Sequence, residues 1–109
     1  MSKYVVFFTF RPEAIKSLMD TPSDRAAVVR SLCESAGGSM ESYYLMLGSA
    51  YDGFTVVEAP DSGTVTAVSL AVTSSGAFSH LETHELVESG DLGGILAKAS
   101  GLTYTAPGT

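Results

Sequence analysis

The sequence predicts an α+β fold in which one four-stranded antiparallel sheet carries its helices on a single face. Segments rich in Val, Phe and Tyr, typical of strands, alternate with segments in which apolar residues recur every three or four positions, typical of helices. Their order is strand, helix, strand, strand, helix, strand, followed by a further helix. Two strand–helix–strand units with right-handed crossovers place the first and third strands at the centre of the sheet and the other two at its edges.

The first strand and two helical segments occupy the N-terminal third of the chain. Residues 3–10 are almost continuously apolar, which predicts a strand. Pro12 suits the first turn of a short helix, because its missing N–H would have no partner there. Thr21 is expected to cap the next helix, and Gly37 and Gly38 to end it. The apolar face of that helix consists of Ala26, Val29, Cys33 and Ala36.

The rest of the chain is predicted to supply three strands and two helices. They are strands at 39–47, 53–59 and 78–87 and helices at 62–75 and 91–99. The segment 62–75 is ambiguous, because its valines have helical spacing while its many β-branched residues favour a strand. A cap at Asp61 and a stop at Gly76 favour the helix. Residues 102–109 are expected to form an extended tail along the surface or along a partner.

Length, composition and charge exclude several classes of protein. With 109 residues, 45% of them apolar, the chain is expected to form one globular domain over residues 1–109. Twelve acidic against six unclustered basic residues give a net charge of −6, which argues against a nucleic-acid partner or an anionic membrane. Cys33 is the only cysteine, so a reducing cytoplasmic location is expected. No Gly-rich phosphate loop or two-Cys redox motif occurs, and no cofactor is expected.

Both faces of the predicted sheet are apolar, although helices can cover only one. The first strand places Tyr4, Val6, Phe8 and Phe10 on one face and Val5, Phe7 and Thr9 on the other. The second strand is expected to place Met40, Tyr44 and Met46 opposite Tyr43, Leu45 and Leu47. Burying about eight uncovered side chains would contribute on the order of 10 kcal/mol. We therefore expect a homodimer packed sheet to sheet, or a higher homo-oligomer, with an interface of roughly 1,600 Å² or more.

Several short motifs resemble the GYD-domain family. They are KYVVFFT (3–9), PEA (12–14), DRA (24–26), GG (37–38), SYY (42–44), YD (51–52), VEAPD (57–61) and SLAV (69–72). Tyr104 and Pro107 resemble the Tyr-x-Pro-Pro ending of that family, whereas Ala50 and Arg11 depart from its pattern. The resemblance implies a ferredoxin-like dimeric α/β barrel with a helix at 62–75. It implies no established activity.

The most suggestive cluster of polar residues is His80, Glu82 and His84, which fall on one face of the last strand. Two histidines and a carboxylate form a familiar metal-binding set. However, His80 and His84 would lie roughly 13 Å apart along an extended strand, too far to share one ion without a bulge. No metal is therefore expected. An acid–base or ligand contact by either histidine remains open beside the plainer interpretation of a polar edge strand.

Other candidates are single residues with competing interpretations. Tyr44 and Tyr51 could line a pocket for an aromatic ligand or pack as ordinary rings. Asp52 is expected to bond the backbone of its own turn. Glu58, a carboxylate in an apolar central strand, could be a catalytic base or could pair with Arg11, His80 or a cation of a second subunit. Tyr43 has the same two interpretations as Tyr44, and Cys33 is expected to be a core residue.

Two functions are compatible with these observations. The first is a dimeric α/β-barrel protein that binds a small organic molecule between sheet and helices, with cofactor-free chemistry as one option. Its ligand-binding residues would be Tyr44, Tyr51, His80, Glu82 and His84, and its catalytic candidates His84, His80 and Glu58. The alternative is a non-catalytic assembly or regulatory module that acts through oligomerisation.

Overall fold

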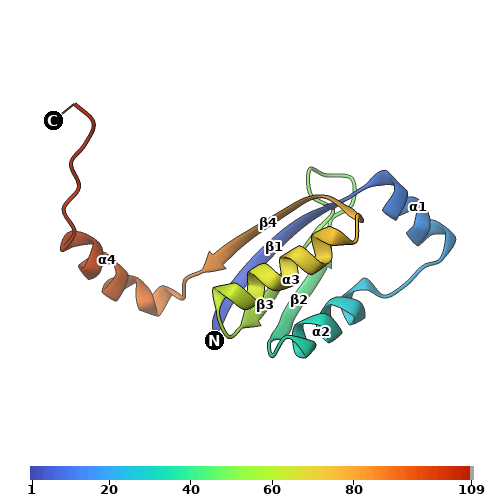
Figure 1. Cartoon of the computed structure of the whole chain (residues 1–109), viewed down its shortest axis with the longest axis horizontal. Coiled ribbons are helices and arrows are strands. Elements are labelled where there is room, and N and C mark those ends of the chain that lie inside the picture. The colour runs from blue at the N-terminus through green and yellow to red at the C-terminus, as the bar shows by residue number, and fades with distance from the viewer. Residues whose placement is uncertain (109) are drawn as a thin grey trace.

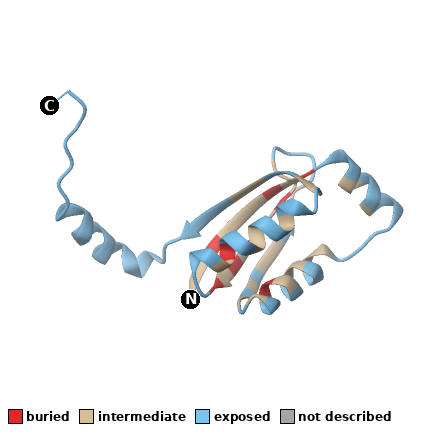
Figure 2. Ribbon diagram, in the orientation of Figure 1, coloured by how far each residue is buried: buried red, intermediate tan, exposed pale blue. Residues whose placement is uncertain are grey.

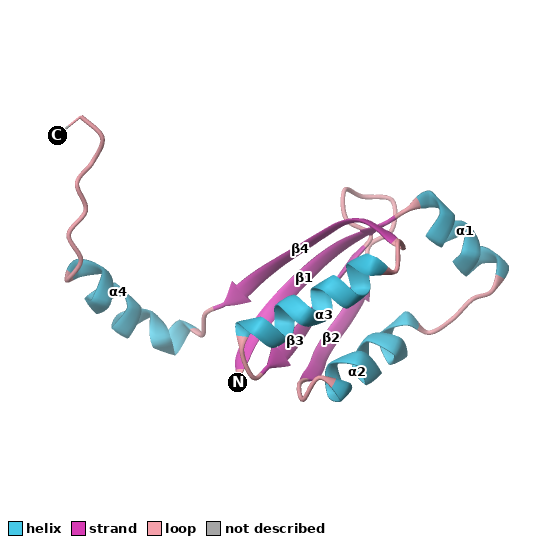
Figure 3. Cartoon of the chain, in the orientation of Figure 1, coloured by secondary structure: helices cyan, strands magenta, loops and turns pink. Residues whose placement is uncertain are grey.

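The computed structural model describes residues 1–108 and contains one four-stranded antiparallel sheet (Figures 1 and 3). Its strands are β1 (Ser2–Phe10), β2 (Ser39–Leu45), β3 (Gly53–Ala59) and β4 (Phe78–Leu86). Their order across the sheet is β2-β3-β1-β4, and every neighbouring pair is antiparallel. The predicted α+β fold, with the first and third strands at the centre, is confirmed.

Helices α2 and α3 cover one face of this sheet, and α1 lies beyond its end (Figure 1). The helices are α1 (Pro12–Asp20), α2 (Arg25–Ser35), α3 (Ser62–Ser74) and α4 (Leu92–Ser100), the last preceded by a 3₁₀ turn (Ser89–Asp91). The helical assignment of 62–75 is confirmed. Asp61 caps α3 by accepting a hydrogen bond of 2.8 Å from the backbone N–H of Thr64. None of the described helices is long and apolar enough to cross a bilayer.

The predicted start of the second helix is wrong. Asp24, not Thr21, is its cap, and its carboxylate accepts a hydrogen bond of 3.2 Å from the N–H of Ala27. Thr21 instead ends α1, because its N–H donates to the carbonyl of Ser17 at 2.8 Å and completes the last turn. Two cap-like residues close together in sequence therefore serve the two ends of a loop.

The hydrophobic core lies between the sheet and the two helices that cover it. Its buried residues are Tyr4, Cys33, Val57, Ala59 and Val65, with Val29 and Met40 packed against them. Burial raises the pKa of the Cys33 thiol, so the predicted core role of this cysteine is confirmed. Phe8, Phe10 and Phe78 continue the core toward α1, with ring centroids 5.1–5.7 Å apart.

A bulge in β2 changes which side chains of that strand face the core. Met40 pairs with Val57, and Ser42 pairs with Val56, so Glu41 is the extra residue. Met40 therefore faces the core together with Tyr43, whereas Tyr44 faces away from the helices. The prediction that Met40 and Tyr44 share a face is wrong, because it assumed an unbroken alternation.

The opposite side of the sheet, here called the open face, has no helix of the described chain packed on it. Register pairs Val5 with Val56 and Phe7 with Phe54 on this face, between the two edge strands. The apolar character predicted for both faces is thus present in the folded chain.

The C-terminal arm (residues 87–108) extends away from the domain as α4 followed by an extended tail (Figures 1 and 2). Every residue of the arm is exposed. The radius of gyration is 17.3 Å, against roughly 13 Å for a compact chain of this length. The tail was predicted to lie along the surface or a partner, and its described part, residues 102–108, does not lie on its own domain, while residue 109 is outside the described residues.

Candidate functional site

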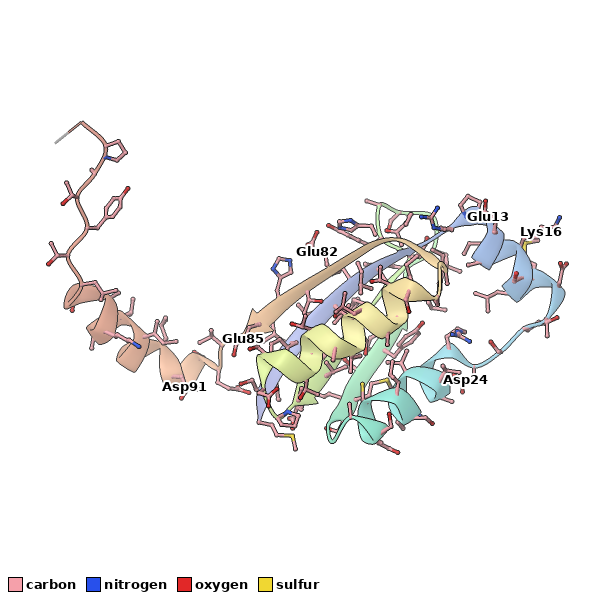
Figure 4. All side chains as sticks on the ribbon, in the orientation of Figure 1. Glu13, Lys16, Asp24, Glu82, Glu85 and Asp91 are labelled. Atoms are coloured by element: carbon pink, nitrogen blue, oxygen red, sulfur yellow. The ribbon has the colours of Figure 1, made fainter. Side chains whose placement is uncertain are left out.

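Three polar side chains converge on the open face around the carboxylate of a fourth residue, Glu82. Nε2 of His84 lies 2.7 Å from Oε2 of Glu82, and Nε2 of His80 lies 3.2 Å from Oε1. The hydroxyl of Tyr51 donates to the same Oε1 at 2.9 Å. Figure 4 shows Glu82 on the side of β4 away from α3. We call these four residues the Glu82 cluster.

Strand alternation brings the three residues of β4 to the open face. The register pairs His84 with Val5, Glu82 with Phe7 and His80 with Thr9, so all three share a face with the outward side chains of β1. Because both histidines are two residues from Glu82, each ring reaches one of its oxygens. The sequence prediction that these residues lie on one face is confirmed.

The loop between β2 and β3 folds back over β1 and delivers Tyr51 to the cluster. The N–H of Asp52 donates to the carbonyl of Phe8 at 2.8 Å, and the Asp52 carboxylate accepts from the N–H of Phe10 at 2.9 Å. Thr9 donates its hydroxyl to the carbonyl of Ala50 at 2.9 Å. Asp52 was expected to bond its own turn, and this prediction is wrong, because the loop returns to the end of a distant strand.

Hydrogen bonds to its ionised form lower the pKa of Glu82 to about 2, with His84 contributing most, then His80, then Tyr51. The same carboxylate raises the pKa of the Tyr51 hydroxyl, mainly through their hydrogen bond. Glu82 is therefore ionised at neutral pH, and its carboxylate can act only as the acceptor in these hydrogen bonds.

Each histidine must consequently donate its Nε2 proton to Glu82. In a neutral imidazole this tautomer leaves Nδ1 as a hydrogen-bond acceptor and a base. The side chains of His80 and His84 are 53% and 57% exposed, so their outer edges are accessible. Chemically, the cluster is one glutamate whose two carboxylate oxygens each orient one imidazole ring.

An aromatic surface adjoins the Glu82 cluster on the open face. The ring of Phe7 lies at its centre, 5.1 Å from Tyr51, 5.9 Å from Phe54 and 6.4 Å from His84. Tyr44 extends the row, 5.6 Å from Phe54. Phe7 and Phe54 were not among the predicted site residues, although strand alternation already placed Phe7 on this face.

The tyrosines of the sequence prediction separate into three positions. Tyr51 belongs to the Glu82 cluster, and Tyr44 belongs to the aromatic row without bonding the cluster. Tyr43 faces the helices, 5.5 Å from the ring of Phe8, and burial raises its pKa. Only Tyr51 and Tyr44 can therefore contact a molecule on the open face.

Glu58 lies apart from the cluster and pairs with a lysine. Its carboxylate is 3.9 Å from Nζ of Lys3, the residue directly opposite in β1. The same ammonium group lies 3.0 Å from Glu41 and 3.5 Å from Glu88, and Glu41 contributes most to raising the pKa of Lys3. An ion pair was expected for Glu58, but neither Arg11 nor His80 is its partner. Among the described residues, no group of three or more His, Cys, Asp or Glu side chains is arranged to hold a metal ion.

The cavities on the helix side of the sheet do not contain the Glu82 cluster. The cavity beneath α2 and α3 has a volume of about 80 Å³ and an apolar lining, well below the roughly 300 Å³ of small ligand sites. A larger, open groove of about 760 Å³ lies between α1, α2 and the strand ends. Neither is lined by Tyr44, Tyr51 or the three β4 residues. The expectation that these residues bind a molecule between sheet and helices is wrong, because they face the other way.

Strand order and helix placement define a ferredoxin-like α+β fold. The GYD domain model matches residues 4–96, and the chain belongs to this family. None of the curated proteins matches the sequence.

The solved structures that are similar to this chain include the following two. One is 5-chloro-2-hydroxyhydroquinone dehydrochlorinase (TftG) from Burkholderia phenoliruptrix AC1100 in complex with 2,5-dihydroxybenzoquinone, with 14% identity and a TM-score of 0.56 over 81% of this chain and 96% of that one. The other is the protein At3g17210 from Arabidopsis thaliana, with 15% identity and a TM-score of 0.43 over 82% of this chain and 96% of that one. At 14% identity, the likeness to the dehydrochlorinase concerns the fold alone.

Proposed function

We propose that this protein binds a small, planar, weakly acidic organic molecule on the open face and that His84 accepts a proton from it. The observation that carries the proposal is the 2.7 Å contact between His84 and Glu82 beside the ring of Phe7. It joins an oriented base to an aromatic surface on which a flat molecule can stack.

Each residue of the site has a distinct role in this proposal. Glu82 holds the His84 tautomer and stabilises the imidazolium that forms when Nδ1 takes a proton. His80 provides a second imidazole for a second polar group of the ligand. Phe7, Phe54 and Tyr44 supply the stacking surface. The chemistry is proton transfer by the chain's own side chains, without a cofactor.

A second copy of the chain is proposed to cover the open face, sheet to sheet. Val5 and Val56, beside the rings on which the ligand would stack, contribute apolar surface there that water solvates poorly. Covering it would also exclude water from the Glu82 cluster, which strengthens its electrostatic interactions. We place this homodimer in the cytoplasm, where an unpaired thiol such as that of Cys33 stays reduced.

Similarity of fold adds support at the level of analogy. The dehydrochlorinase is described in complex with 2,5-dihydroxybenzoquinone, a flat molecule with acidic hydroxyl groups. Because one fold hosts many functions, this analogy suggests the class of ligand to test first and nothing about the reaction.

The test is calorimetric titration of the protein with flat phenols and hydroxyquinones, beginning with 2,5-dihydroxybenzoquinone. Binding should weaken at least about tenfold in His84→Ala and in Glu82→Gln, because a good hydrogen bond to a charged group contributes roughly 1.5–3 kcal/mol. Glu85→Gln is the matched control, since Glu85 lies on the same strand but pairs with buried Tyr4. The proposal fails if none of the compounds binds, or if His84→Ala binds as well as the wild type.

The alternative function, a non-catalytic assembly or regulatory module, is favoured by one observation, the exposed apolar arm. It would be supported if no ligand bound while His80→Ala and His84→Ala left self-association unchanged.

A further inference from the structure

The C-terminal arm exposes apolar side chains that its own domain does not cover. Leu92, Ile95 and Leu96 form a stripe at helical spacing on α4, each about half exposed. Leu102 and Tyr104 of the tail are 71% and 81% exposed. Only the start of α4 borders the domain, where Ile95 lies in a shallow pocket with Met1 and Lys3. Apart from this contact of Ile95, the stripe has no partner within the described chain.

Helix α4 has little intrinsic stability of its own. It has nine residues, no side-chain cap hydrogen bond, and glycines at positions 93 and 94 in its first turn. Isolated helices of this length are marginal in water, and each glycine weakens a helix relative to alanine. Packing against another surface would supply the missing stabilisation.

The total accessible surface is large enough to accommodate an extensive interface. It is 7266 Å², which exceeds by about 1,500 Å² the roughly 5,700 Å² expected for a compact monomer of this mass. A standard interface buries only about 800 Å² on each partner. The excess therefore matches what each chain of an extensive dimer would bury.

We infer that the arm of each copy docks into the groove between α1 and α2 of a second copy of this chain. That groove, of about 760 Å³, is lined by apolar side chains of both helices and of the strand ends, including Phe10, Ala14, Leu18, Val28, Val29 and Leu32. Lys98 is the only charged residue of α4, and the groove carries Glu13, Asp20 and Arg25. The apolar stripe and the groove are complementary, with acidic groups available to Lys98.

The arm and the groove lie at opposite ends of the molecule. In Figure 4, Asp91 at the start of the arm and Glu13 on α1 lie at the two ends of the sheet. An arm therefore does not meet the groove of its own chain. A second copy with its strands running in the opposite direction brings its groove to the arm, and a two-fold axis makes the exchange reciprocal. This inference rests on the second copy of the proposed function but not on its ligand.

The experiment is disulfide cross-linking between two variants, both in a Cys33→Ala background. Ala14→Cys, in the groove, is mixed with Leu96→Cys, on the arm, and oxidised after subunit exchange. A disulfide-linked heterodimer is expected as the main product. Leu70→Cys is the matched control, because Leu70 is exposed on α3 outside the groove. It should form at least about tenfold less product with Leu96→Cys.

A second measurement is sedimentation equilibrium of Leu96→Asp, in which self-association should weaken at least tenfold while Leu70→Asp resembles the wild type.

A dimer in which Leu96→Cys forms equal cross-links with Ala14→Cys and Leu70→Cys would overturn arm exchange but leave the sheet-to-sheet dimer. A disulfide that forms only when Ala14→Cys and Leu96→Cys are in the same chain would indicate folding back and also overturn it. A wild-type protein that is monomeric at micromolar concentration would overturn both. If the cross-link forms but none of the compounds binds, the proposed ligand is refuted and arm exchange is supported.

Discussion

Tyr51 donates its hydroxyl proton to Oε1 of Glu82 at 2.9 Å, which joins the loop after β2 to the opposite edge of the sheet. The loop reaches that far because Asp52 and Ala50 are bonded to the end of β1. Strand β1 thus holds Tyr51, from the loop between β2 and β3, beside the carboxylate of Glu82 on β4.

Replacing Tyr51 with phenylalanine should raise the pKa of Glu82 above its value of about 2, because the Tyr51 bond is one of three that lower it. The ring contact with Phe7 is retained in this variant. Carbon-13 NMR titration of the Glu82 carboxyl measures the change. Tyr44→Phe is the control, because Tyr44 is on the same face without bonding Glu82, and an equal shift in both variants would contradict the assignment.

The Glu82 cluster should make stability depend on pH in the acid range. The folded-state pKa of Glu82 is lowered from 4.5 to about 2, so its contribution is full above 4.5 and is lost as the pH falls toward 2. Urea unfolding of the wild type and Glu82→Gln at a series of pH values measures this. The stability advantage of the wild type should shrink with acidification. A constant difference down to pH 2 would refute the lowered pKa.

The sequence predicted the sheet order and the common face of the three β4 residues because both follow from local periodicity and connection rules. Strand alternation put His80, Glu82 and His84 together without any knowledge of distant contacts. By contrast, the bonding of Asp52 to the N–H of Phe10 spans 42 residues and has no local signal. The bulge at Glu41 has no local signal either, because it depends on pairing with β3 and not on the residue types within β2.

The side of the sheet on which a ligand would bind was also mispredicted from sequence. The prediction of a ligand between sheet and helices did not relate the face of the β4 residues to the face of β1 that the helices cover. His84 pairs with Val5, and Val5 points away from the helix side on which Tyr4 is buried. The alternation of β1 therefore already excluded a site beneath the helices.

Gly53→Ala should destabilise the fold by about 1–3 kcal/mol, the usual cost of overpacking a filled site. An added Cβ would lie 2.5 Å from the ring of Phe8 and 2.6 Å from the carbonyl oxygen of Tyr44. Denaturation in urea measures the loss. Gly90→Ala is the control, because nothing lies within 4 Å of a Cβ there. Equal stabilities for the two variants would show that β1 and β2 shift to accommodate the methyl group.

Asp52→Ala should cost about 1–3 kcal/mol, because the partly buried N–H of Phe10 then loses its acceptor at 2.9 Å. Asp52→Asn keeps an oxygen at that position and should recover much of the loss. Both values come from urea unfolding monitored by circular dichroism. If the alanine and asparagine variants are equally stable, the hydrogen bond contributes nothing and the backbone contacts of the loop suffice.

The extra residue in β2 limits how this chain can change in length. Deleting Glu41 would leave Met40 opposite Val57 and Ser42 opposite Val56 without a bulge, so that Met40 and Tyr43 would both still face the core. Natural variants of this strand should therefore tolerate the loss of residue 41 more readily than the loss of Tyr44, which would turn Leu45 to the opposite face of the sheet, whereas the loop 46–52 and the arm have no comparable register to keep.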